Sequence, residues 1–104
     1  MFAIVRLDRA VLLCAERPLN GAAAPQLHGI LDGAITEGAS PIVVDLVSVP
    51  TIDEGIVAVL AAAADRIGHS GLCLELRLAG DRRFRLKSAF ELRAALAQGF
   101  PEAA

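Results

Sequence analysis

Apolar residues are spaced in two different ways along the chain. In some segments they are adjacent or alternate with polar residues, which is typical of strands, and in others they recur every three or four positions, which is typical of amphipathic helices. Residues 2–7 and 10–15 are strand-like and separated by a short polar break, which predicts an antiparallel hairpin. Residues 41–48 are almost continuously apolar and branched, which predicts a central strand buried on both faces between parallel neighbours. Residues 72–78 alternate with period two in their second half, which predicts a strand with one wetter face.

Two amphipathic helices are predicted between these strands. The first follows Asn20, a residue type that caps helices, has Pro25 in its first turn, and ends at Gly38. The second begins at Asp53 and is expected to be closed by Gly68 and by Ser70-Gly71. Their apolar stripes have helical spacing and consist of Leu27, Ile30, Leu31, Ala34 and Ile35 in the first helix and Ile56, Val59, Leu60, Ala63 and Ile67 in the second.

Residues 80–100 have two readings, a short strand followed by a helix or one distorted helix. Ser88 and Glu91 have the spacing of a capping box, in which each side chain satisfies a free backbone donor at a helix start. This favours a basic edge strand over 82–86 and a helix over 89–98. The apolar positions of that helix are Phe90, Leu92, Ala95 and Leu96.

The order of elements is therefore β-β-α-β-α-β-(β)-α. Alternating strands and helices predict an α/β fold with crossover helices, and the opening hairpin makes its sheet of four to five strands mixed. A length of 104 residues is that of a single domain, which we expect to cover residues 1–104.

Composition narrows the classes of function. Hydrophobic residues are 55% of the chain and aromatic residues only 4%, so the core is built mainly from Ala, Val, Leu and Ile. The net charge of −2 argues against nucleic-acid binding, which needs a basic surface. No apolar run reaches the ~20 residues of a membrane span. Residues 1–5 are followed directly by charged residues, so they lack the uninterrupted apolar core of a signal peptide. We therefore expect a cytoplasmic protein without membrane insertion. Cys14 and Cys73 lie apart in apolar surroundings and are expected to be buried, inert thiols.

The most informative segment is residues 43–60, in which a buried strand, a tight loop and a helix start follow one another. Binding surfaces of open α/β sheets commonly lie at the carboxyl ends of the strands. Asp53 is placed to cap the helix, and Glu54 lies in its first turn, where the helix dipole favours negative charge. Both acids can also be explained as helix starters alone. We call residues 50–55 the switch loop: Pro50, Thr51, Ile52, Asp53, Glu54 and Gly55.

Several motifs, in this order and spacing, resemble the STAS family of anti-sigma factor antagonists. They are Leu19-Asn-Gly-Ala-Ala-Ala-Pro-Gln-Leu27, similar to the family's entry into its first helix, and the Asp-Leu-x-x-Val and Ile-Asp elements between residues 45 and 53. The resemblance covers about residues 4–79. It implies a mixed sheet with helices mainly on one face, no enzymatic activity, and a partner that is an anti-sigma factor with serine kinase activity or another regulatory protein. The sequence has no metal-ligand cluster and no phosphate-binding Gly-rich loop, so we expect no cofactor or metal. The family has a further helix near the C-terminus for which residues 80–100 are too short, so the C-terminal part is expected to be shortened.

The sequence departs from the family where the family carries its switch. The family's loop usually reads Asp-Ser-x-Gly-Leu, with a Ser that the partner kinase phosphorylates; by this resemblance its Asp falls on Asp53 and its Ser on Glu54. Glu54 has no hydroxyl and carries about one negative charge, against ~1.5 to 2 for phosphoserine. Either Glu54 holds the module in a phosphorylated-like state, or the switch is lost and the loop is a plain docking surface. Ser48 and Thr51 are nearby hydroxyls that could be modified instead.

Three other functions remain open. The chain could be a constitutive subunit docking on a membrane transport ATPase, since some STAS proteins of that kind also lack the Ser. It could be a small-ligand or nucleotide sensor with a polar pocket beside Asp45 and Asp53. An enzyme is least favoured: Asp45 is taken as a structural or partner-facing carboxylate, and His28 and His69 belong to different elements. The basic residues at 82–87 are interpreted as protecting an edge strand against aggregation.

Overall fold

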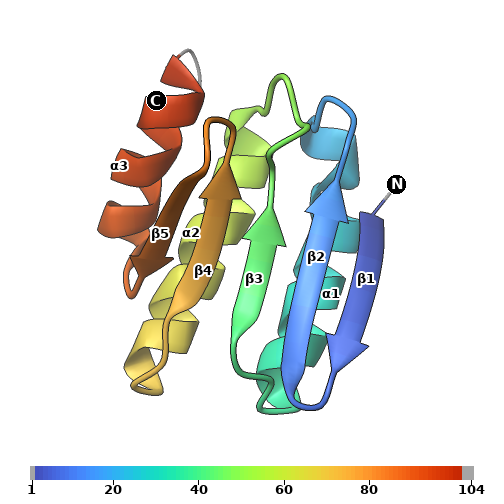
Figure 1. Cartoon of the computed structure of the whole chain (residues 1–104), viewed down its shortest axis with the longest axis vertical. Coiled ribbons are helices and arrows are strands. Elements are labelled where there is room, and N and C mark those ends of the chain that lie inside the picture. Colours follow the sequence, from blue (N-terminus) through green and yellow to red (C-terminus); the bar gives the residue numbers. More distant parts are fainter. Residues whose placement is uncertain (1, 102–104) are drawn as a thin grey trace.

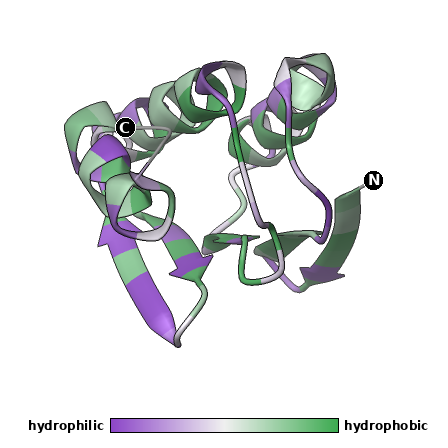
Figure 2. Ribbon diagram, turned by 90° about the horizontal axis from the view of Figure 1, so that it is seen from above, coloured by the Kyte–Doolittle hydropathy of each residue, from purple (hydrophilic) through white to green (hydrophobic). Residues whose placement is uncertain are grey.

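The computed structural model describes residues 2–101, which form a five-stranded sheet with all helices on one face (Figures 1 and 2). The strands are β1 (Phe2–Leu7), β2 (Ala10–Ala15), β3 (Ile42–Asp45), β4 (Leu74–Leu78) and β5 (Arg82–Leu86). The helices are the 3₁₀ turn η1 (Gly21–Ala23), α1 (Ala24–Thr36), α2 (Glu54–His69) and α3 (Ala89–Gly99). The predicted mixed α/β sheet is confirmed, and residues 80–100 form a strand and a helix rather than one helix.

The strands lie in the order β1-β2-β3-β4-β5. The outer pairs β1–β2 and β4–β5 are antiparallel hairpins, and β3 pairs in parallel with both of its neighbours. The hairpin turns place Asp8 (φ 56°) and Asp81 (φ 58°) in the left-handed region, which Asp tolerates better than most residues because its short side chain can bond locally. Parallel pairing needs crossovers, and α1 and α2 provide them.

The central strand β3 is shorter than predicted. Ile42, Val43 and Val44 are all buried, as expected for a strand covered on both faces, but the strand ends at Asp45. There the Asp45 carboxylate accepts a hydrogen bond from the Val47 amide at 2.9 Å, and the Val49 amide bonds the Leu46 carbonyl at 3.1 Å. Branched residues continue beyond this point, but the local turn takes the chain out of the sheet.

Helix α2 lies between α1 and α3 and is the most buried of the helices (Figure 1). Its inward face combines Ile56, Leu60 and Ile67 with small residues such as Ala61 and Ala64. Alanines allow close helix approach at no cost in side-chain entropy, which explains how a chain with few aromatic residues fills its core. Within the described residues, no helix has both the length and the apolar character needed to cross a bilayer.

Three expectations differ in detail from the structure. Phe90 was placed on the apolar face of α3 but is 83% exposed, while Leu92, Ala95 and Leu96 are buried. Helix α2 ends at His69 with Ser70 as its C-cap, so the expected close at Ser70-Gly71 holds, but Gly68 is still helical. A Cβ at Gly68 would overlap the Lys87 carbonyl, so this glycine serves close packing. Cys14 and Cys73 are half-buried rather than buried, and desolvation, with a smaller effect of Asp45, raises the pKa of the Cys14 thiol.

Candidate functional site

The switch loop lies at the carboxyl end of the parallel strands and is tied to the segment that follows β2. Leu19 and Ile52 form an isolated parallel bridge, in which the Leu19 amide donates to the Thr51 carbonyl at 2.9 Å and the Asp53 amide donates to the Leu19 carbonyl at 3.1 Å. Ile52 is buried between these bonds, and Pro50 and Thr51 are exposed on the outer side. The loop is therefore anchored by its backbone and by one apolar side chain.

Asp53 joins two helix starts. Its Oδ1 accepts from the Ile56 amide at 3.3 Å and caps α2 as predicted, while its Oδ2 accepts from the Gly21 amide at 2.5 Å. Gly21 begins η1, whose cap is Asn20 through a 2.9 Å bond from the Ala22 amide. Both oxygens of the Asp53 carboxylate are thus used by backbone donors.

Gly21 and Gly55 allow the two helix starts to approach closely. A Cβ on Gly55 would lie 3.3 Å from the Gly21 Cα, tighter than most contacts of a real side chain. The resemblance drew attention to residue 55, but the role of Gly21 depends on the tertiary contact and could not be inferred from its neighbours in sequence. The two helix starts therefore lie close together, and the side chain of Glu54 is exposed beside them.

Glu54 is paired with Arg93 of α3. The guanidinium donates from Nη1 to Oε1 at 3.1 Å and from Nη2 to Oε2 at 2.9 Å, a bidentate arrangement that fits a planar carboxylate. The hydrogen bond from Arg93 lowers the pKa of Glu54, and the same bond raises the pKa of Arg93. Arg93 was missed by the sequence analysis because it lies 39 positions away and no local motif links the two residues.

The remaining predicted carboxylate, Asp45, accepts a hydrogen bond from the Val47 amide and so supports the turn after β3, whereas Asp53 accepts from the Gly21 amide. Surface hollows of about 210 and 230 Å³ lie elsewhere, and neither is lined by Asp45 or Asp53. Their lining residues are Ser40, Pro41, Gly71, Leu72, Cys73, Glu75 and Arg85 for the first, and Phe84, Arg85, Leu86, Phe90, Glu91, Ala94, Ala95 and Gln98 for the second. Among the described residues, no group of His, Cys, Asp and Glu could hold a metal ion.

The exposed members of the switch loop lie beside the first turn of α2. They include Pro50, Thr51 and Glu54. The carboxylates of Asp45 and Asp53 both accept hydrogen bonds from backbone amides. Glu54 is therefore the carboxylate of this loop whose bonds are made to a side chain, that of Arg93.

Comparison with known proteins shows the fold. No protein-family model matches the sequence, and no curated protein matches it significantly. The structure is similar to that of a candidate anti-sigma factor antagonist from Thermotoga maritima, with a TM-score of 0.65 and 20% identity over 93% of this chain and 80% of that one. It is also similar to the anti-sigma factor antagonist SpoIIAA in its unphosphorylated form, with a TM-score of 0.62 and 18% identity over 75% of this chain and 71% of that one. The chain therefore has the STAS fold of anti-sigma factor antagonists.

Proposed function

We propose that this protein is a non-enzymatic, cytoplasmic regulatory module that binds a partner protein through the switch loop and the start of α2. The observation that carries the proposal is the fold shared with anti-sigma factor antagonists. Its support in the site is the anchored, exposed loop at the carboxyl end of the sheet, with Asp53 holding two helix starts together. By the resemblance, the partner is an anti-sigma factor with serine kinase activity or a related regulatory protein.

Glu54 defines the state of this module in the proposal. It occupies the position that the resemblance assigns to the phosphorylated Ser, and its carboxylate is held by the Arg93 guanidinium. A bidentate guanidinium also suits a phosphate, which presents similar paired oxygens. We therefore favour the first of the two hypotheses, in which Glu54 holds the module in a phosphorylated-like state that does not bind the partner kinase.

Restoring the hydroxyl tests this proposal. The wild type, Glu54→Ser and Glu54→Ala are immobilised and used to capture proteins from a lysate of the source organism, with and without ATP. We expect both variants, but not the wild type, to retain an anti-sigma factor with a kinase domain. We further expect ATP to release it from Glu54→Ser, with phosphate found on residue 54, and not from Glu54→Ala.

Glu37→Ala is the matched control. Glu37 is also an exposed glutamate paired with an arginine, since the Arg6 Nη1 lies 3.3 Å from its carboxylate, but it stands at the C-terminal end of α1. This control should behave as the wild type. Equal capture of the same partner by all four proteins would refute the phosphate-mimic hypothesis and indicate a constitutive docking subunit. If that partner is a transport ATPase, the protein is a subunit of the ATPase complex.

A further inference from the structure

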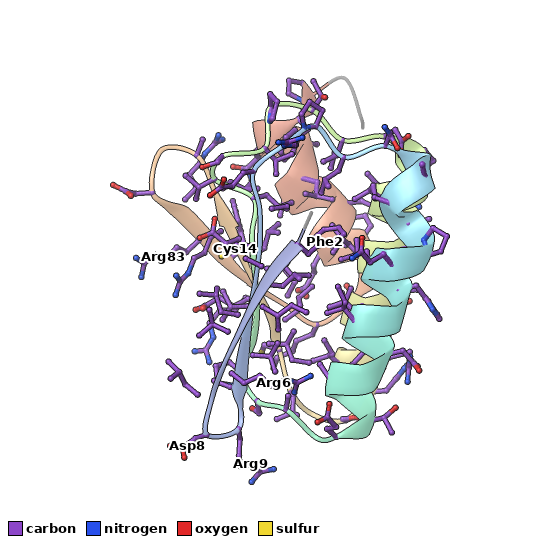
Figure 3. The ribbon with its side chains drawn as sticks, turned by 90° about the vertical axis from the view of Figure 1, so that its right-hand side faces the viewer. Phe2, Arg6, Asp8, Arg9, Cys14 and Arg83 are labelled. Carbon is purple, nitrogen blue, oxygen red and sulfur yellow. The ribbon has the colours of Figure 1, made fainter. Side chains whose placement is uncertain are left out.

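The outer edge of β1 is unprotected. In the part of the chain that the structure describes, no strand pairs with this edge, which faces the viewer in Figure 3. The strand pairs with β2 over its whole length without a bulge, and it contains no proline. Ile4 is 43% and Leu7 71% exposed, and Arg6 is its one charged residue. Folded proteins usually blunt such edges, because free amides and carbonyls on an apolar strand invite pairing with another strand.

The opposite edge of the sheet has the protection that β1 lacks. Strand β5 carries Arg82, Arg83 and Arg85, and Figure 3 shows Arg83 projecting from the face away from the helices. The Arg82 side chain also bonds the Ala79 carbonyl at 3.0 Å and the Gln98 carbonyl at 2.9 Å. Like charges on β5 disfavour pairing with another β5, so of the two edges of the described sheet β1 is the one better suited to self-association.

The direction of the free backbone groups on β1 follows from the β2–β3 contact. The Val11 amide donates to the Pro41 carbonyl at 3.0 Å, so Val11 faces β3. Because the groups of neighbouring residues alternate along a strand, Ala10 and Leu12 face β1, and so their partners Leu7 and Val5 face β2. The amides and carbonyls of Phe2, Ile4 and Arg6 consequently point to the free edge.

We propose that two copies of this chain associate through antiparallel pairing of their β1 strands, with Ile4 opposite Ile4 at the two-fold axis. This register uses all three residues that face the edge, whereas a register centred on Val5 leaves Phe2 unpaired. It also sets each Arg6 opposite Phe2 of the second copy, while parallel pairing would align the two Arg6 side chains. A symmetric dimer formed by one self-complementary patch results.

The dimer leaves the proposed partner surface accessible and does not depend on it. A two-fold axis perpendicular to the sheet keeps the helices of both copies on one face of a continuous sheet. Because β1 of one copy runs antiparallel to β1 of the other, the two switch loops lie at opposite ends of the assembly. Each loop could therefore bind a partner without obstruction by the other.

Measurement of mass in solution with charged variants tests the proposal. By light scattering after size exclusion, we expect the wild type to have twice the 10.8 kDa mass of one chain. Ile4→Lys and Ile4→Glu should each shift to 10.8 kDa, because like charges then meet at the axis. An equimolar mixture of the two should return to the doubled mass, because Lys then faces Glu.

Val5→Lys and Val5→Glu are the matched controls. In the proposed register Val5 lies opposite Ala3 of the second copy, so mixing these two variants should not increase association over either alone. A second measurement uses the wild type only: amide hydrogen exchange at Ile4 and Arg6 should accelerate on dilution, while exchange at Val5 and Leu7 stays unchanged. A monomeric wild type at its highest soluble concentration, a dimer that Ile4→Lys leaves intact, or a mixture that stays monomeric would each overturn the proposal.

Discussion

Arg93 in α3 donates two hydrogen bonds, of 2.9 and 3.1 Å, to the carboxylate of Glu54 at the start of α2. The pair joins the last helix to the switch loop, although the two residues lie 39 positions apart. Both side chains remain accessible, with exposed fractions of 66% for Glu54 and 48% for Arg93. The pair therefore positions a charge at the surface and adds little to the stability of the fold, as is usual for exposed ion pairs.

The Glu54 carboxyl should titrate at a lower pH than an ordinary glutamate. Its pKa is lowered from 4.5, mainly by the Arg93 hydrogen bond, so the stabilising contribution of the pair is complete above pH 4.5 and is lost as the pH falls through the lower folded-state pKa. Arg93→Gln should raise the pKa of Glu54 back toward 4.5, as followed by NMR of the side-chain carboxyl. Arg66→Gln, which breaks the exposed pair with Asp32, is the control and should leave that pKa unchanged.

Asp53→Ala should destabilise the fold by about 1–2 kcal/mol, because the cap of α2 is lost and the Gly21 amide loses its acceptor. Asp53→Asn keeps one acceptor oxygen and should cost less. Urea denaturation followed by circular dichroism gives both values. Equal stability of Asp53→Ala and the wild type would mean that the carboxylate does not link the two helix starts.

Gly68→Ala should destabilise the protein by about 1–3 kcal/mol, because the added methyl group overlaps the Lys87 carbonyl and forces the α2 end and the β5–α3 connection apart. Gly33→Ala is the matched control in α1. Apart from its chain neighbours and the backbone of its own helix, no heavy atom of the described residues lies within 4 Å of a Cβ at Gly33, so this variant should gain about 0.5–1 kcal/mol from helix propensity. Thermal unfolding of the two variants should therefore change in opposite directions, and a change in the same direction would contradict the close packing at Gly68.

Leu92→Ala should cost about 2–5 kcal/mol, as expected for a fully buried leucine whose removal leaves a cavity. Phe90→Ser, two positions earlier, should change stability by no more than about 0.5 kcal/mol, because its ring lies in solvent. Chemical denaturation measures both. A large loss from Phe90→Ser would indicate that this ring packs against the domain after all.

The misplacement of Phe90 has a simple geometric origin. Leu92, Ala95, Leu96 and Gly99 follow one helical stripe, and Phe90 lies about 200° around the helix from Leu92 at 100° per residue. Strict use of the periodicity would have left Phe90 outside, but the hydrophobicity of the residue suggested the core. Gly68 was expected among the residues that close α2, because glycine is common at helix ends. Its packing against Lys87 has no local signal, because it involves a segment that follows two further strands.

The candidate site was predictable where its signals are local. Asp53 as a cap and Glu54 in the first turn follow from residue type and position next to a buried strand. The second hydrogen bond of Asp53, to Gly21, and the pairing of Glu54 with Arg93 involve residues more than thirty positions away. Such contacts depend on how helices are placed against one another, which no short motif encodes.

The order and type of the elements, the mixed sheet and the residues of the switch loop can be read from local patterns in the sequence. Hydrophobic periodicity, caps and turn residues act within a few positions, and each leaves a local pattern. The pairing of Glu54 with Arg93, the close approach of Gly68 to Lys87 and the place of β1 at an edge of the sheet follow from the tertiary structure alone. The physical reason is that these features depend on strand order and on helix packing. Both are stabilised by contacts between residues that are far apart in the sequence.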